Sequence, residues 1–381
     1  MSNKMKVPVL KPYLDEREEE AVIEVLRSGW LIMGKNVEEL ERRVATMVGA
    51  RYAKACNSCT AALHMAMLAL GIGPGDKVLV PAYTFVATAN AVEYTGAEVV
   101  FVDVDPKTFN IDVNDTMERY LQAREGVKAV VPVHLFGLNA YVKPFFELSD
   151  EIKIVEDAAC AMGSKGPEGY AGAIGSIGCY SFHPRKSIAT GEGGMVVTND
   201  IELAEKMHQF RDFGFTGTNL ERHEKGVTVM PEVNLLGYNY RMTDILGAIG
   251  VAQIKKWDEI VSKKLALAKI YDKELADVAW LQTPYVPDGY FHTYQSYACM
   301  VDPKVDRASV MNQLKEAGVA TREGTHNVPL LGYYAKKYGH KRGDFPGADK
   351  CDKQCMTIPM YPGLKEDEQT YVIEMIKKVR V

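Results

Sequence analysis

One lysine of the chain lies in a sequence pattern that favours covalent chemistry. Lys186 follows the apolar run Cys179–Phe182 and precedes a Gly-Glu-Gly-Gly turn that leads into the apolar run Met195–Val197. The pattern predicts two sheet strands with the lysine in the turn between them. If this lysine is desolvated, its amine can be neutral near pH 7 and can form a Schiff base. Most lysines are solvated surface residues, so the prediction depends on what the rest of the chain supplies.

Two further positions could hold a cofactor beside this lysine. The segment Cys56–Ala62 begins an apolar helix, whose first N–H groups, together with the hydroxyls of Ser58 and Thr60, could bind an anion. Asp157 ends a short apolar run, and a carboxylate at a strand end can keep a pyridinium nitrogen protonated. Each position also has a plainer interpretation as a helix cap. An anion site, an acid and a lysine together indicate a cofactor site.

Other kinds of site have weaker signals. Cys56 and Cys59, with Cys351 and Cys355, offer four thiols, but the second spacing is too long for a standard zinc pair. We therefore expect no metal site. The Gly-x-Ser-x-Gly motif of serine hydrolases is absent from the sequence, so nucleophilic serine catalysis is not indicated.

The composition is that of an ordinary folded protein. Of the 381 residues, 47% are hydrophobic and 25% are charged, which is enough for sizeable cores. The net charge of −5 gives no footprint of nucleic-acid binding, so no nucleic-acid partner is expected. The most apolar stretch, Ala61–Gly73, is too short to cross a bilayer, so no membrane insertion is expected. Seven cysteines and the lack of a hydrophobic leader favour a cytoplasmic location.

Helices and short apolar strands alternate after Asn57. The expected strands are Lys77–Val80, Glu98–Val102, Lys128–Val133 and Lys153–Glu156. The expected helices are Asp15–Arg27, Val37–Val48, Thr60–Leu70, Phe85–Tyr94, Thr243–Asp258 and Glu259–Leu275. Alternation predicts a mainly parallel sheet with both faces covered, in which ligands bind beyond the carboxyl ends of the strands. The two strands around Lys186 are expected to form a hairpin at the edge of this sheet.

The last third of the chain predicts a smaller unit. The strand-like run Tyr294–Val301 and the helical runs Ala308–Ala317 and Asp367–Val379 indicate an α+β domain. We therefore expect a large domain over residues 1–258 and a small C-terminal domain over residues 259–381.

Two connections are unusual for surface loops. The apolar loop Gly29–Gly34 is typical of an interface if it is exposed, and it could otherwise cap the core. The stretch Gly214–Asn234 has no clear periodicity, and loops of that length are usually functional. Its Arg222, His223 and Lys225 could reach the active site of a neighbouring subunit.

The chain resembles the DegT-type sugar aminotransferases, which use pyridoxal phosphate (PLP). The resemblance covers about Val7 to Ile376, and the segments that carry it are NSCTAALHMAMLALGIGPGD, PAYTFVATANAV, FVDVDPKTFNID, VEDAA, SFHPRKSIATGEGGMVVTND and GYNYRMTDILGAIG. It implies the α/β fold of aspartate aminotransferase, PLP-dependent fold type I. That fold has a mixed, mostly parallel seven-stranded sheet and a small C-terminal α+β domain.

The resemblance also implies a role for each site residue. Lys186 would be the catalytic lysine that binds PLP, Asp157 the partner of the pyridine nitrogen and Phe85 the aromatic side chain stacked on the ring. The groups implied to hold the phosphate are Ser58, the Cys59 N–H, Thr60, Ser181 and, from the other subunit of a homodimer with shared active sites, Asn239.

Two cysteines depart from the usual family pattern. Cys59 stands where many relatives have glycine, which is tolerable if only the backbone binds phosphate. Cys160 stands where glutamine or histidine is frequent, so it would lie beside the cofactor without their polar contact.

The expected reaction is a ping-pong transfer through Schiff bases. Glutamate would donate its amino group, and a keto-sugar would accept it. Relatives that dehydrate sugars carry histidine at the lysine position, whereas this chain keeps Lys186. The wording Thr-Gly-Glu-Gly-Gly-Met after the lysine is similar to members that act at C4 of a nucleotide-linked 4-keto-6-deoxy sugar. The product would serve amino-sugar biosynthesis for lipopolysaccharide or another glycan.

Candidate substrate residues are Arg185 beside the lysine, His326 and Asn327 in a Thr-His-Asn-Val-Pro turn, and Tyr333 and Lys336 in the basic and aromatic stretch Gly332–Arg342. That stretch would suit a diphosphate, or it could be a solvated helix with its tyrosines packed inward.

Other functions remain open. The acceptor could be a C3-keto sugar, or a keto-sugar or cyclitol without a nucleotide. The same fold could also carry a PLP-dependent elimination or dehydration. A PLP-binding regulatory protein is a further alternative, which the acidic charge disfavours.

Overall fold

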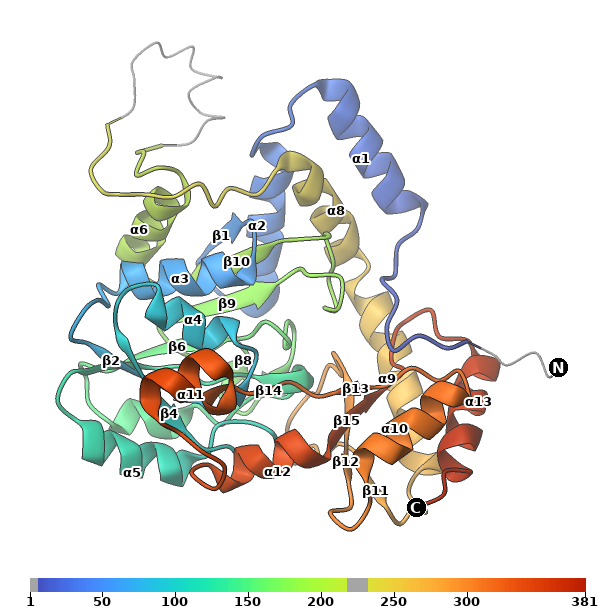
Figure 1. Cartoon of the computed structure of the whole chain (residues 1–381). Coiled ribbons are helices and arrows are strands. Elements are labelled where there is room, and N and C mark those ends of the chain that lie inside the picture. The colour runs from blue at the N-terminus through green and yellow to red at the C-terminus, as the bar shows by residue number, and fades with distance from the viewer. Residues whose placement is uncertain (1–5, 218–231) are drawn as a thin grey trace.

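The main element of the molecule is a mixed sheet. The computed structural model describes residues 6–217 and 232–381, and within them this sheet has seven strands (Figure 1). In spatial order they are β1 (Tyr52–Cys56), β10 (Gly194–Thr198), β9 (Ile177–Ser181), β6 (Lys153–Asp157), β5 (Val127–Val130), β2 (Lys77–Pro81) and β4 (Glu98–Val102). The strands from β4 to β9 run parallel, whereas β10 is antiparallel to both β9 and β1. The predicted mixed, mostly parallel sheet is confirmed.

Helices cover both faces of this sheet. They are α2 (Lys35–Val48), α3 (Cys59–Ala69), α4 (Ala87–Glu93), α5 (Val113–Ala123), α6 (Ile201–Arg211) and α8 (Asp244–Lys255), while α1 (Glu16–Ser28) and α9 (Trp257–Glu274) pack against α8. Successive residues of a strand point to opposite faces, so Val196 packs in the core that contains α3 and Val197 in the core that contains α2. Because both faces are covered, every residue of β10 is buried.

A smaller antiparallel sheet follows in the last third of the chain. Its order is β11 (Leu281–Gln282), β12 (Tyr297–Val301), β15 (Cys355–Ile358) and β13 (Arg322–Glu323). The accompanying helices are α10 (Arg307–Glu316), α11 (Gly332–Tyr338), α12 (Pro346–Gln354) and α13 (Glu366–Lys377). Two short pairs complete the described strands: β3 (Tyr83–Thr84) with β14 (His326–Asn327), and β7 (Lys165–Gly166) with β8 (Gly169–Tyr170).

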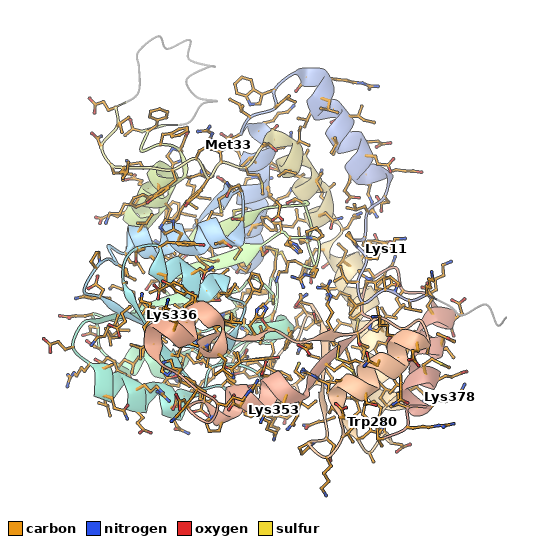
Figure 2. The ribbon with its side chains drawn as sticks, in the orientation of Figure 1. Lys11, Met33, Trp280, Lys336, Lys353 and Lys378 are labelled. Atoms are coloured by element: carbon orange, nitrogen blue, oxygen red, sulfur yellow. The ribbon has the colours of Figure 1, made fainter. Side chains whose placement is uncertain are left out.

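Helix α9 takes part in two cores. Ile260 in its first turn belongs to the core of Met33, whereas Leu267 and Tyr271 belong to the core of Trp280. Met33 and Trp280 lie at well-separated parts of the molecule (Figure 2). The change of core therefore occurs within α9, and the domain boundary after Asp258 stays a prediction.

One prediction about the large sheet is wrong. The hairpin around Lys186 was expected at the sheet edge, but β10 is an inner strand, because β1 pairs along its whole length from Tyr52↔Thr198 to Cys56↔Gly194. The expectation is wrong because β1 was not predicted. Helices α5 and α6 were not predicted either.

Helix α4 begins later than its pattern suggested. The predicted helix started at Phe85, but α4 starts at Ala87. The preceding residues Tyr83 and Thr84 form strand β3, which pairs with β14 from far along the chain. This long-range pairing holds the segment before Phe85 extended.

None of the helices in the described ranges is long and apolar enough to cross a membrane.

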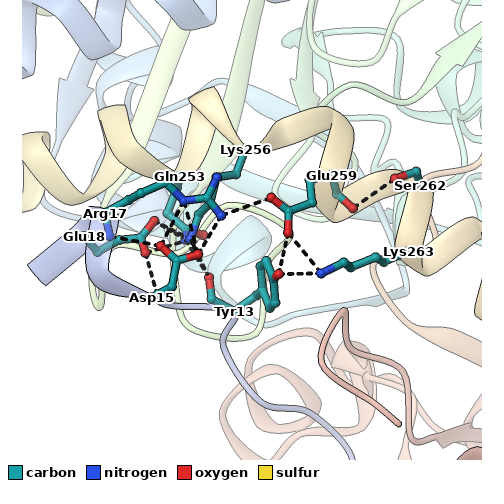
Figure 3. A network of polar contacts seen from close by, with 9 residues as sticks. All are labelled: Tyr13, Asp15, Arg17, Glu18, Gln253, Lys256, Glu259, Ser262 and Lys263. Atoms are coloured by element: carbon teal, nitrogen blue, oxygen red, sulfur yellow. Dashed lines mark hydrogen bonds and ion pairs between the residues drawn. The ribbon is translucent and has the colours of Figure 1, made fainter. Parts of the chain in front are cut away.

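A buried polar network fastens the N-terminal segment to the junction of α8 and α9 (Figure 3). Glu18 and Lys256 are 4% and 2% exposed, and the Lys256 Nζ lies 2.7 Å from a carboxylate oxygen of Glu18. Gln253 donates to Glu18 Oε1 at 2.9 Å and to the Tyr13 carbonyl at 2.8 Å. The Asp15 N–H donates to the same carboxylate at 2.8 Å. The buried charge of Glu18 is thus compensated from several sides.

Replacing Lys256 by methionine tests this compensation. Lys256→Met leaves the Glu18 carboxylate buried without its cation, so we expect the free energy of unfolding to fall by about 3–5 kcal/mol in urea titrations. Lys255→Met is the matched control, because Lys255 is the exposed neighbour on the same helix. Adding Glu18→Gln to Lys256→Met should recover part of the loss. Equal stability of the two lysine variants would contradict this account.

Candidate functional site

Lys186 lies in the turn between β9 and β10, as the sequence predicted. Main-chain hydrogen bonds close this turn: the Phe182 N–H donates to the Gly193 carbonyl at 2.9 Å, and the Thr190 N–H donates to the Phe182 carbonyl at 2.8 Å. The Lys186 N–H itself donates to the His183 carbonyl at 2.8 Å. The turn that carries the lysine is therefore closed by local bonds.

Asp157 ends β6, directly beside β9, where it is in register with Cys179. Its side chain is 5% exposed. Oδ2 accepts a hydrogen bond from Thr88 Oγ1 at 2.7 Å, and Oδ1 accepts one from the Ala159 N–H at 3.1 Å. The carboxylate is thus held in one orientation at the carboxyl edge of the sheet. Thr88 was not predicted as a site residue, because in the sequence it is an ordinary threonine within an apolar helix.

The N-terminus of α3 approaches the start of β10 closely. Ser58 caps the helix, and its Oγ accepts from the Ala61 N–H at 3.1 Å. A Cβ atom added at Gly194 would lie 2.4 Å from the Ser58 carbonyl and 2.6 Å from the Cys59 nitrogen, so only glycine fits there. Among the described residues, no acceptor bonds to the N–H groups of Cys59 and Thr60. The helix end therefore combines a side-chain cap with free donors suited to an anion.

Cys160 contacts the lysine amine directly. The Lys186 Nζ lies 3.0 Å from the Cys160 Sγ. Burial lowers the pKa of Lys186, but the Cys160 sulfur, with Cys59 and Asp157, outweighs burial and holds this pKa above its usual value. Desolvation, the condition under which a neutral amine was expected, therefore does not act alone on Lys186 in the chain as described. The Cys160 sulfur is the neighbour that the amine contacts directly.

Phe85 and His326 meet at the junction of the large sheet and the C-terminal part. Their ring centroids are 5.6 Å apart and their planes are inclined by 42°. The pairing of β3 with β14 sets this contact, since His326 lies opposite Thr84. Phe85 is 49% exposed, and its carbonyl accepts from the Thr88 N–H at 3.1 Å, while the Thr88 hydroxyl donates to Asp157. The aromatic side chain is thus linked to the aspartate through one threonine.

The remaining predicted cofactor residues lie on either side of this group. Ser181 ends β9, and its Oγ accepts from the His183 N–H at 3.3 Å. Asn239 is exposed, and its carbonyl accepts from Asn57 Nδ2 at 3.5 Å. Its side chain has no described partner within residues 6–217 and 232–381.

The predicted substrate residues differ in accessibility. Arg185 is exposed, and partial desolvation and the nearby Arg322 guanidinium lower its pKa. Asn327 is 4% exposed, and its amide donates to Asp349 Oδ1 at 2.9 Å, so it joins β14 to α12. Arg222, His223 and Lys225 lie outside the described residues.

The basic and aromatic stretch Gly332–Arg342 is largely occupied by contacts within the chain. Lys337, Tyr333 and Tyr338 all bond to the carboxylate of Glu93 on α4. Arg342 lies 3.4 Å from Asp349 and 2.9 Å from Asp352. Lys336 lies on α11 with its side chain exposed (Figure 2).

Removing the Cys160 sulfur tests its influence on the lysine. Cys160→Ala leaves burial as the largest influence on Lys186, so we expect the pKa of this amine to fall. The pH dependence of Lys186 acetylation, followed by mass spectrometry on the cofactor-free protein, measures this pKa. Cys299→Ala, which removes a buried thiol from the small sheet, is the control and should leave the profile unchanged. An unaltered profile in Cys160→Ala would refute the assignment.

Known proteins share both the sequence and the fold. The chain is 34% identical over 375 residues to GDP-perosamine synthase of Escherichia coli O157:H7, with 98% of each chain covered. It is 35% identical to the spore coat polysaccharide biosynthesis protein SpsC of Bacillus subtilis, over 98% of this chain and 97% of that protein. Among solved structures, the aminotransferase TlmJ from Streptoalloteichus hindustanus matches with a TM-score of 0.88 at 31% identity, covering 97% of each chain. A family model matches residues 12–377, and the chain therefore belongs to the DegT/DnrJ/EryC1/StrS aminotransferase family.

Proposed function

We propose that this aminotransferase uses PLP to move an amino group from glutamate to a keto-sugar, most specifically to C4 of a nucleotide-linked 4-keto-6-deoxy sugar. One observation carries the proposal: the turn with Lys186 joins β9 to β10, Asp157 ends β6 directly beside β9, and Gly194 at the start of β10 lies against the N-terminus of α3. A reactive amine, an acid and a helix N-terminus are thus gathered at one edge of the sheet, which is where ligands of such sheets bind.

The residues at this edge fit PLP. Asp157, held by Thr88, would pair with the pyridine nitrogen, and Phe85 would cover the ring. The Cys59 and Thr60 N–H groups, with the hydroxyls of Ser58, Thr60 and Ser181, would hold the phosphate. The close approach of β10 to the N-terminus of α3, which only a glycine at position 194 allows, supports this phosphate site because it brings the lysine turn next to the same helix end. When bound, PLP supplies an electron sink for the bond broken at the amino-acid Cα atom.

Lys186 would perform the proton transfers. Its amine must first lose the proton that Cys160 and Asp157 help to retain. Once neutral, it would act as the general base that takes the Cα proton of glutamate and then, as the ammonium, as the general acid that delivers this proton to the C4′ carbon of the bound cofactor. In the second half-reaction it would make the same transfers in reverse on the keto-sugar. Thr88 and the Ala159 N–H keep the Asp157 carboxylate in place throughout.

Cations without acidic partners would receive the anionic parts of the substrates. Arg185 and Arg322 are both exposed and lie near each other, and no described carboxylate pairs with either side chain. This favours them over Lys337 and Arg342, whose charges are already paired. His326 beside Phe85 and, farther out, Tyr333 and Lys336 are further candidates. Asn327 would need to leave Asp349 to reach a substrate.

A second copy of the chain would complete the site. We propose that Asn239 of one subunit reaches the phosphate site of the other. Exposed apolar side chains on α1 and the following loop support an interface between copies: Ile23, Leu26, Leu31 and Ile32 are 44–55% exposed. Leu31 and Ile32 belong to the apolar loop Gly29–Gly34, for which the sequence pattern indicated an interface. Two proteins named GDP-perosamine synthase, each 34% identical to this chain, support a nucleotide-linked acceptor.

The visible absorption of the PLP-loaded protein tests the reaction. We expect glutamate to bleach the cofactor band and to release 2-oxoglutarate in a single turnover, and a nucleotide-linked 4-keto-6-deoxy sugar to restore the band. Lys186→Ala should show neither change, whereas Lys269→Ala, which alters an exposed lysine of α9, should react normally. A band unaffected by glutamate, with release of pyruvate or ammonia from an amino acid, would instead establish elimination. Parallel assays with 3-keto sugars and keto-cyclitols decide the acceptor.

Removing the acid tests the role assigned to Asp157. Asp157→Ala should lower turnover by on the order of 100-fold, while PLP occupancy falls much less, because the phosphate contacts remain. Thr88→Val, which removes one hydrogen bond to the same carboxylate, should give a smaller loss in the same direction. Turnover and occupancy are measured on the same samples by absorbance and by 2-oxoglutarate release. Equal losses of both in Asp157→Ala would contradict the assigned role.

A further inference from the structure

Both sequence neighbours of Lys186 are held by buried side chains from the C-terminal part of the chain. The Arg185 carbonyl accepts from Gln295 Nε2 at 2.7 Å, and the Ser187 Oγ accepts from Lys264 Nζ at 3.2 Å. Gln295 and Lys264 are 6% and 3% exposed. The reactive lysine thus lies between two long-range contacts, one on each side.

The burial of the Lys264 amine lowers the stability of the folded chain. Within the described residues, the hydroxyl of Ser187 is the only hydrogen-bond partner of the Lys264 amine, and no carboxylate pairs with it. Burial lowers the pKa of Lys264 to about 7, against a small opposing effect of Cys160. His292, the other titratable group facing it, is held neutral because burial and the Lys264 charge lower its pKa to about 3. A buried amine without a counter-ion destabilises a protein, and an apolar side chain of similar length is often better tolerated.

The segment that carries Gln295 is held in place by main-chain hydrogen bonds on both sides. The Thr293 N–H donates to the Gly137 carbonyl at 3.1 Å, and the Ser296 N–H donates to the Phe136 carbonyl at 3.3 Å. Tyr294 between them has a positive φ of 46°, a conformation that costs a non-glycine residue stability and persists only where its surroundings impose it. The Gln295 Oε1 accepts from the Ser296 hydroxyl at 3.2 Å, which leaves the amide nitrogen for Arg185.

We propose that Lys264 and Gln295 are positioning residues that hold residues 185–187 from both sides, Gln295 through the Arg185 carbonyl and Lys264 through the Ser187 hydroxyl, and thereby fix where the Lys186 amine lies. The turn is already closed by its own main-chain bonds, so these two contacts are not required to form it. A reacting group displaced by about 1 Å can lose about 100-fold in rate. The inference rests on the proposed function only in taking Lys186 as the reacting amine.

Hydrogen exchange on the cofactor-free protein tests the positioning. In Lys264→Met and Gln295→Leu we expect faster exchange of the amides of residues 183–190. Ser187→Ala should reproduce the effect of Lys264→Met, and the double variant should be no worse than either single one, because both remove the same contact. Lys269→Met and Gln282→Leu are exposed controls on α9 and β11 and should exchange as the natural chain does. Unchanged exchange in both positioning variants would overturn the proposal.

Thermal unfolding separates positioning from a merely structural role. Below pH 7 Lys264 is charged in both the folded and the unfolded chain, so burial of the charge lowers the free energy of unfolding by its full amount. Between pH 7 and the usual pKa of 10.5, the folded chain has lost this proton and the unfolded chain still holds it, so the destabilisation becomes smaller as the pH rises. Stability conferred by Lys264→Met should therefore be greatest below pH 7 and decline as the pH rises toward 10.5. A lower melting temperature in Lys264→Met at every pH would indicate a structural role and overturn the proposal.

The half-reaction with glutamate gives the second readout. In the PLP-loaded positioning variants we expect the single-turnover rate to fall by about 10–100-fold and the isotope effect with Cα-deuterated glutamate to rise, because proton transfer becomes slower. A loss of active protein alone would lower the amplitude and leave the isotope effect unchanged, which would also overturn the proposal. If the natural chain itself does not react with glutamate, the proposed function fails, while hydrogen exchange and unfolding still decide the positioning.

Discussion

The reversal of strand direction between β9 and β10 is the constraint on which the site depends. β9 runs parallel to β6, so both strands end at the same edge of the sheet, and the chain must turn there to return as β10. That turn carries Lys186, and the end of β6 carries Asp157. A parallel return would have required a long crossover and moved the lysine away. β1 then covers β10, so the turn projects from an inner part of the sheet and not from a free edge.

Two amines near this turn show how neighbouring groups shift the pKa of a lysine. Lys186 is partly buried and contacts Cys160, and its pKa is raised although desolvation lowers it. Lys264 has only a hydroxyl partner, and burial lowers its pKa to about 7. The contrast follows from what lies within a few ångströms of each nitrogen, because burial by itself always disfavours the charged amine. Lys256, by contrast, is buried with a carboxylate partner, because its Nζ lies 2.7 Å from an oxygen of Glu18.

The C-terminal part contributes to the site through contacts that cross the whole chain. β14 pairs with β3 and brings His326 against Phe85, while Gln295 and Lys264 reach the residues that flank Lys186. The C-terminal part therefore does more than complete the fold. Strand β14, helix α9 and the segment before β12 set the surroundings of the reactive lysine, and the last of these contains Tyr294 with its positive φ.

The sequence by itself determined the alternating strands and helices, the position of Lys186 in a turn and the family to which the chain belongs. These features are local, since they depend on hydrophobic period, turn residues and short motifs. The inner position of β10, the late start of α4 and the pKa of Lys186 were decided only by the tertiary structure. Each depends on a partner remote in sequence, namely β1, β14 and Cys160. Long-range pairing and electrostatic contact leave no periodic signal in a single chain, so only the folded molecule reveals them.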